Sequence, residues 1–302
     1  MGNNLIIFGA GASFGSDKSG TPPLGKDLFD ALCSFNLEGW GQISKEFSTI
    51  FHEDFEEGMR CLAEKHSHFL PPLQRAMAAF FFNFMPQSTN LYIKLAEKVK
   101  NKKWAGSLAT LNYERLLESS LISTGIQPVV GKISESQHGI ELCLPHGCCH
   151  IFCESVRGTA RGISFSGPNV TTNGPVKVIA NQQEFSSRIA NDAFPPVMSY
   201  FDPAKRTTSG ASFIENQRRR FSELVISAPI IGIVGLKVRP HDKHIWDPIS
   251  KSDSKIVYCS GITAGNEFKN WAKETRSNKK NIVLPHYFSD GFDDLTCLLG
   301  IE

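Results

Sequence analysis

Small and polar residues follow four short apolar segments of this sequence, and together they could line a ligand site. The glycine-rich run Gly9–Ser13 follows the first segment, Asn112 follows a second, and His146 follows a third after one proline. Gly235 ends a fourth segment, and Asp242 follows it seven residues later. In open α/β sheets, ligands bind outside the carboxyl ends of the strands. We therefore expect these groups to meet at one edge of a sheet.

The glycine-rich run has the composition of a phosphate-binding turn. Leu5–Phe8 is predicted as a short buried strand, and the residues after it are Gly9, Ala10, Gly11, Ala12 and Ser13. Such small residues let backbone N–H groups approach an anion closely. They can also serve helix–sheet packing alone, and both interpretations stay open. The dinucleotide fingerprint of dehydrogenases does not fit, because Phe14 stands where its third glycine is required.

A loop stiffened by prolines follows the glycine-rich run. It covers Gly20–Gly25 and precedes a predicted helix that begins at Lys26. A loop of this length favours a lid that covers a ligand. Thr21 and Pro22 would be part of this lid. A plain surface loop is the alternative.

The elements that must position these residues alternate between strands and helices. Strands are expected over 5–8, 107–111, 140–144, 151–156, 176–180, 230–234, 255–259 and 281–284. Helices are expected between most of them, at 112–118, 211–227, 265–276 and 290–299. This order predicts an α/β protein with a Rossmann-like, doubly wound parallel sheet.

Two segments stand apart from this alternation within what we expect to be one domain over residues 1–302. From about 40 to 104 the pattern is helical and rich in phenylalanine, in three parts separated by Pro71-Pro72 and Pro86. It predicts an inserted helical layer, buried on two sides or used as an oligomer contact. The stretch of about 157–175 is rich in Gly, Ser, Thr and Asn, and we expect a mobile loop there.

Composition narrows the classes of function. The 302 residues are 41% hydrophobic and 21% charged, which is enough for a sizeable core. A net charge of +2 with short basic clusters gives no evidence of direct nucleic-acid binding. No apolar run is long enough to cross a membrane, and no signal peptide is evident. We expect a cytoplasmic protein whose eight cysteines are mostly reduced thiols.

The order of the motifs resembles the sirtuin family. The shared pieces, in chain order, are GAGAS at Gly9–Ser13, Gly20-Thr21-Pro22, Leu111-Asn112-Tyr113-Glu114 and His146-Gly147. The segment from Gly235 to Ile245 is similar to the branch of sirtuin-like proteins found in bacterial antiphage systems. Two departures count against protein deacylation. No C-x-x-C pair follows His146 for a zinc ribbon, and the sirtuin Asp-Phe-Arg is replaced by Pro23-Leu24-Gly25.

The resemblance implies a role for each of these residues. Asn112 would hold the nicotinamide ribose and orient a water molecule, and His146 would act as the general base. Gly9–Ser13, Thr21 and Pro22 would cradle and cover the pyrophosphate. Gly235 belongs to the cofactor-binding set, and Asp242 would bind a ribose hydroxyl or cap a helix.

Each of these side chains also has an ordinary structural role open to it. Asn112 could cap a helix, and His146 could be a turn residue. His241 and His244, one helical turn apart, are expected at solvated helix positions. The cysteines beside His150 are expected to be plain thiols, with no metal.

The resemblance also implies the reaction. NAD, as substrate, would be hydrolysed to nicotinamide and ADP-ribose, which depletes the cofactor during antiphage defence. Such an activity needs a gate, supplied by homo-oligomer assembly or by a partner such as a hexameric ATPase. The alternatives are an NAD-dependent protein deacylase and a non-catalytic module that senses NAD or ADP-ribose.

Overall fold

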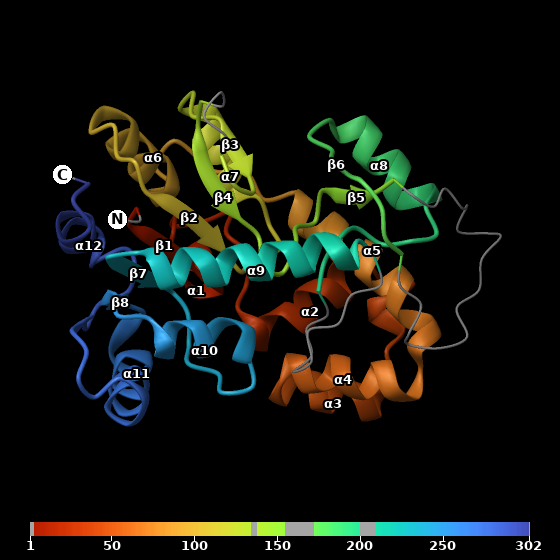
Figure 1. Ribbon diagram of the computed structural model, residues 1–302. Coiled ribbons are helices and arrows are strands. Elements are labelled where there is room, and N and C mark those ends of the chain that lie inside the picture. The colour runs from red at the N-terminus through yellow and green to blue at the C-terminus, as the bar shows by residue number, and fades with distance from the viewer. Residues whose placement is uncertain (1–2, 134–137, 155–171, 200–208, 302) are drawn as a thin grey trace.

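A parallel sheet organises the molecule. The computed structural model describes residues 3–133, 138–154, 172–199 and 209–301. Seven of the described strands form one sheet in the order β3-β4-β2-β1-β7-β8-β9 (Figure 1). They are β1 (Leu5–Phe8), β2 (Ser107–Thr110), β3 (Pro128–Val130), β4 (Ile140–Cys143), β7 (Ile230–Val234), β8 (Lys255–Cys259) and β9 (Asn281–Leu284). The first strand lies inside the sheet and later strands add on both sides, so the doubly wound α/β prediction is confirmed.

Helices cover both faces of this sheet. They include α1 (Ala10–Phe14), α2 (Gly25–Phe35), α7 (Leu116–Ser123), α9 (Ala211–Ser227), α10 (Lys243–Lys251), α11 (Gly261–Thr275) and α12 (Phe292–Leu298). In β1, Leu5 and Ile7 pack in a core with residues of α9, α10 and α11. Ile6 and Phe8 belong to the core on the other face, with α2, α7 and α12. A strand buried on both faces must be apolar throughout, which explains the sequence of β1.

The predicted helical insertion is present, but its divisions differ from the prediction. It contains α3 (Lys45–Glu53), α4 (Phe55–Lys65), α5 (Leu70–Phe82) and α6 (Leu91–Asn101), with short 3-10 turns η1 (Trp40–Gln42) and η2 (Ser67–Phe69). The first predicted part is split at Asp54, because its carboxylate accepts the Glu56 and Glu57 N–H groups and caps α4. Pro71 and Pro72 do not separate two parts; they lie in the first turn of α5, where missing N–H groups cost nothing.

A smaller pair of strands lies outside the main sheet. The expected strands near 151 and 176 pair antiparallel as β5 (Ile151–Cys153) and β6 (Val176–Val178). Helix α8 (Gln182–Asn191) and the edge strand β3 were not predicted. Residues 157–171 of the loop expected at about 157–175 lie outside the described residues.

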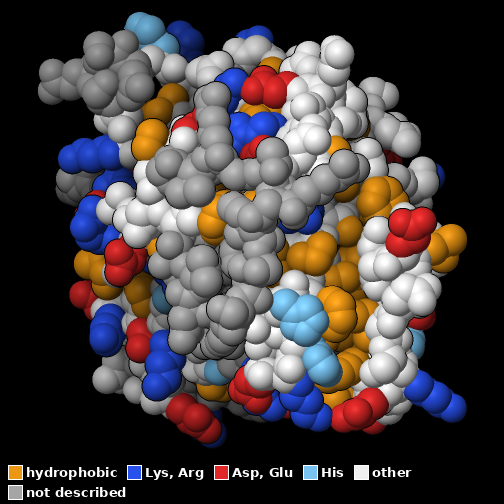
Figure 2. All heavy atoms as spheres, turned by 90° about the vertical axis from the view of Figure 1, so that its right-hand side faces the viewer, with side chains coloured by type: hydrophobic (Ala, Val, Ile, Leu, Met, Phe, Trp, Pro, Cys, Tyr) orange, Lys and Arg blue, Asp and Glu red, His pale blue; other side chains and the backbone are white. Residues whose placement is uncertain are grey.

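The insertion helices also form a hollow on the molecular surface. Figure 2 shows hydrophobic side chains gathered beside two histidines on the face that these helices occupy at the right of Figure 1. A cavity of about 430 Å³ opens there, lined in part by Ile43, Phe47, Leu62, His66, Phe69 and Leu73. None of the predicted site residues lines it. In the described ranges, no helix combines the length and the apolar character that a bilayer crossing requires.

Candidate functional site

The predicted site residues come together at the carboxyl ends of β1, β2, β4 and β7. Phe8, the last residue of β1, is in register with Thr110 of β2 and Val234 of β7. The segments that follow these three strands therefore begin side by side at the same edge of the sheet. The Asn112 side-chain Nδ2 donates to the Gly9 carbonyl oxygen at 3.2 Å and to Ser13 Oγ at 2.8 Å.

The orientation of the Asn112 amide is fixed by this pairing. A backbone carbonyl can only accept a hydrogen bond, so the nitrogen end of the amide must face Gly9. Its Oδ1 end is then the acceptor that remains for a ligand hydroxyl or a water. Helix α7 begins at Leu116, and Arg115 is its N-cap residue. Asn112 is therefore not a helix cap, and the structural alternative for this residue is excluded.

Ser13 is fully buried and joins three side chains. Its hydroxyl donates to Glu114 Oε1 at 2.5 Å and lies 3.0 Å from the Tyr92 hydroxyl. Because its one proton goes to Glu114, Ser13 accepts from both Tyr92 and Asn112. The hydroxyl is then saturated. Ser13 positions Asn112 rather than offering its side chain to a phosphate.

Glu114 and Tyr92 are the other two hydrogen-bond partners of Ser13 in this network. Burial raises the pKa of the Glu114 carboxyl, although the bonds from Ser13 and from the Leu116 N–H oppose the shift. Burial, with the nearby Glu114, also raises the pKa of Tyr92 well above its ordinary value. Tyr92 therefore stays a phenol and donates to Ser13. The sequence predicted no role for either residue; the only signal was the place of Glu114 two residues after Asn112.

His146 lies in the tight turn after β4. Its ring Nδ1 is 3.2 Å from the Leu111 carbonyl oxygen, so this nitrogen carries a proton and donates. In the neutral ring, Nε2 is then the basic atom. Gly147 closes the turn with a φ of 77° and an N–H donated to Leu144 O at 2.9 Å. His146 is thus a turn residue, as the structural alternative predicts. Its ring is also bonded to the carbonyl of Leu111, the residue that precedes Asn112.

A second histidine contacts His146. His244 Nε2 lies 2.8 Å from His146 Nε2, and the two rings are 5.0 Å apart. The expectation that His244 occupies a solvated helix position is wrong, because the first turn of α10 packs against the turn after β4. His241 does lie exposed and contacts Glu56. Helix periodicity alone could not reveal a contact between residues 98 positions apart.

The glycine-rich run interlocks with the end of β7. The Gly9 N–H donates to Val234 O and the Gly11 N–H to Gly235 O, both at 2.9 Å. A Cβ added to Gly235 would lie 1.9 Å from the Ala12 nitrogen. Both glycine segments are therefore needed for backbone contact with each other. The Ala12 N–H donates to Gly9 O, so these three amide groups are used within the fold.

The remaining predicted residues lie in the loop before α2 and at the start of α10. Thr21 Oγ1 donates to the Phe14 carbonyl at 3.1 Å, and Pro22 is buried, so this part of the loop is tied to α1. Asp242 is buried at the N-cap position of α10, but its side chain makes no capping hydrogen bond there. Its backbone carbonyl instead accepts the Ile245 and Trp246 N–H groups.

Cysteine and histidine side chains form one possible metal-binding group among the described residues. Ligand atoms of Cys148, Cys149 and His150 all lie within 4.8 Å of one another. All three residues are buried.

Comparison with solved structures finds Sir2 proteins over nearly the whole chain. Sir2Tm bound to a propionylated peptide has 14% identity and a TM-score of 0.46, over 99% of this chain and 94% of that one. A Sir2 homologue mutant in complex with ADP-ribose has 14% identity and a TM-score of 0.48, over 98% and 92%. No protein-family model matches the sequence, and no curated protein matches it.

Proposed function

We propose that this chain hydrolyses NAD to nicotinamide and ADP-ribose. The observation that carries the proposal is the bonding of the Asn112 amide to both Gly9 and Ser13, with His146 held at the neighbouring Leu111 carbonyl. This places an oriented amide oxygen and an imidazole beside a small-residue turn. The motif order that resembles the NAD-hydrolysing branch of sirtuin-like proteins supports the same reaction.

NAD hydrolysis requires few catalytic side chains. Cleavage of the nicotinamide–ribose bond passes through a state with oxocarbenium character, as glycoside hydrolysis does. The site must hold the ribose, leave room for the departing nicotinamide and deliver water. In our proposal Asn112 Oδ1 accepts from a ribose hydroxyl or the attacking water. His146 Nε2 takes the proton that is released.

His244 occupies the hydrogen-bonding position of His146 Nε2, the atom that would accept this proton. Its Nε2 faces the basic nitrogen of His146 at 2.8 Å, so a substrate hydroxyl or water must displace it. We infer that His244 masks the base in the ligand-free protein and is not itself required for the reaction. Removal of this side chain should leave NAD cleavage at least as fast as in the wild type.

The cellular part of the proposal follows from the same resemblance. The enzyme would act in the cytoplasm during antiphage defence and deplete NAD. Self-assembly, or a partner such as a hexameric ATPase, would hold the activity in check until it is needed. The expected assembly is a homo-oligomer.

The test is NAD loss and product identity, measured by chromatography with and without co-purifying proteins. Asn112→Ala and His146→Ala should each lower NAD cleavage by about 100-fold or more, which is the scale for loss of a general base. His244→Ala should keep the activity. Matched controls are Asn216→Ala and His68→Ala, since both residues are exposed and neither belongs to the segments that carry the candidate site.

Other outcomes would assign a different function. Cleavage that persists in both site variants contradicts the assignment of Asn112 and His146. NAD consumption that depends on an acetylated peptide indicates a deacylase. NAD binding without turnover, under every condition, indicates a sensor module.

A further inference from the structure

Two cysteines and a histidine converge in the core behind the candidate site. Cys148, Cys149 and His150 follow Gly147 directly, and none of the three exposes more than 2% of its surface. His150 Nδ1 lies 3.1 Å from Cys148 Sγ. The three ligand atoms all lie within 4.8 Å of one another. Thiolate sulfur and imidazole nitrogen are the donors of structural zinc sites, and these residues supply three of the four that a tetrahedral site uses.

The opposite side of the histidine ring is arranged as metal-bound histidines usually are. His150 Nε2 lies 2.9 Å from Glu118 Oε2, and the Glu118 side chain is only 12% exposed. A carboxylate accepts, so Nε2 carries the ring proton and Nδ1 is the nitrogen that faces the thiols. A carboxylate that holds the distal N–H of a ligating histidine fixes its tautomer and raises its basicity.

We propose that Cys148, Cys149 and His150 form a buried Zn²⁺ site, with Glu118 orienting His150. Thiolate and imidazole donors select zinc or copper over magnesium and calcium. Two thiolates neutralise a divalent cation, whereas a monovalent one would leave net negative charge in the core beside Glu118. This proposal replaces the expectation of plain thiols without a metal, and its donors are not those of a C-x-x-C ribbon.

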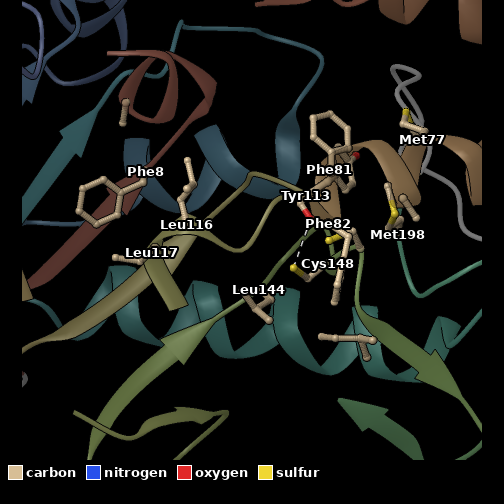
Figure 3. Close-up of a cluster of buried hydrophobic side chains, with 14 of the residues drawn as sticks. Phe8, Met77, Phe81, Phe82, Tyr113, Leu116, Leu117, Leu144, Cys148 and Met198 are labelled. Carbon is tan, nitrogen blue, oxygen red and sulfur yellow. Dashed lines mark hydrogen bonds between the residues drawn. The ribbon is translucent and has the colours of Figure 1, made fainter. Parts of the chain in front are cut away.

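The site would join the two turns that carry the candidate catalytic residues. The Cys149 N–H donates to the Tyr113 carbonyl at 2.8 Å. In the metal-free protein the Cys148 thiol also donates to this oxygen at 3.2 Å, and the thiolate that binds zinc gives up that bond. Figure 3 shows Cys148 beside Tyr113, with Phe82 next to them. Tyr113 follows Asn112, and Cys148 comes two residues after His146. A metal here would stabilise the turns without touching substrate.

The experiment uses the full chain without a histidine tag, produced in zinc-supplemented medium. Inductively coupled plasma mass spectrometry should find one zinc per chain. Because the site is buried, Co²⁺ is added while the protein refolds from urea. Binding by thiolates should then give sulfur-to-cobalt charge-transfer absorption. Cys61→Ser, which removes a half-buried thiol in α4, is the matched control and should keep both signals.

Two variants decide between the outcomes. Cys148→Ser should lose the zinc and the charge-transfer band while circular dichroism still reports a folded chain. If that variant does not fold, Glu118→Gln provides the test. It keeps all three donors but should weaken zinc binding about 10–100-fold in competition with a chromophoric chelator. Wild-type protein without stoichiometric zinc or a cobalt band, or unchanged affinity in Glu118→Gln, would overturn the proposal.

Discussion

The hydroxyl of Ser13 shows how much of the candidate site depends on single buried atoms. It accepts from Asn112 and Tyr92 and donates to Glu114, so each of its hydrogen-bonding positions is used. Glu114 accepts in turn from the first N–H of α7. The orientation of Asn112 therefore depends on a carboxylate that the substrate never needs to meet. Buried networks of this kind are stabilising only while every member has its partner.

Glu114 should make the stability of the protein depend on pH. Burial raises its folded-state pKa above the ordinary 4.5. Below pH 4.5 the group is protonated in both states, and its contribution to stability is complete. As the pH rises toward the folded pKa, the unfolded chain loses this proton more readily, so the free energy of unfolding falls. Each unit of elevation corresponds to about 1.4 kcal/mol.

Urea unfolding of the wild type and Glu114→Gln across a pH series measures this contribution. The stability of the Gln variant relative to the wild type should rise with pH above 4.5 and then level off. Glu53→Gln, at an exposed glutamate of α3, is the control for the effect of the substitution itself. A pH-independent difference for Glu114→Gln would contradict the assignment.

At the scale of elements, the strands were predicted well and the long-range side-chain contacts were not. The strands over 230–234, 255–259 and 281–284 have the predicted bounds, because each is a short apolar run between polar turns. Sheet topology then brings Gly9, Asn112 and His146 together without further information. Tyr92 and His244 were missed, because their partners are 79 and 98 residues away in sequence. No local pattern encodes such pairs.

The interlock between α1 and the end of β7 leads to a prediction about two glycines. Gly235 and Gly300 have similar positive φ values, 62° and 71°. A Cβ on Gly235 would lie 1.9 Å from the Ala12 nitrogen, whereas nothing lies within 4 Å of one on Gly300. Gly300→Ala should therefore cost only the left-handed strain, about 1 kcal/mol. Gly235→Ala should cost about 3 kcal/mol or more, because it also forces two backbones apart.

Thermal and urea unfolding of both variants tests this difference. NAD cleavage should fall in Gly235→Ala and not in Gly300→Ala, since only the former displaces the glycine-rich run. Equal losses of stability would show that backbone strain alone, and not the close approach, requires glycine at 235.

On the scale of the whole molecule, the helical insertion shares a core with the sheet. Phe51, Phe55 and Met59 of the insertion are buried in the same cluster as Ile6 and Phe8 of β1. The insertion phenylalanines named in this cluster are thus core residues of the chain. The Phe82 ring of α5 also stacks on Phe185 of α8, at 3.7 Å between centroids. These contacts tie the insertion to segments on both sides of it in sequence.

We therefore expect the chain to unfold as one cooperative domain. Hydrogen exchange followed by mass spectrometry, at a series of urea concentrations, reports each part separately. Peptides from α4 and α5 should lose protection at the same urea midpoint as peptides from β7 and β8, because exposing either group opens the shared core. An insertion that lost protection at a clearly lower midpoint would be an independent unit, and the single-domain prediction would be wrong. Coincident midpoints would also mean that a substitution in the insertion can weaken the candidate site through global stability alone, with no contact between the two.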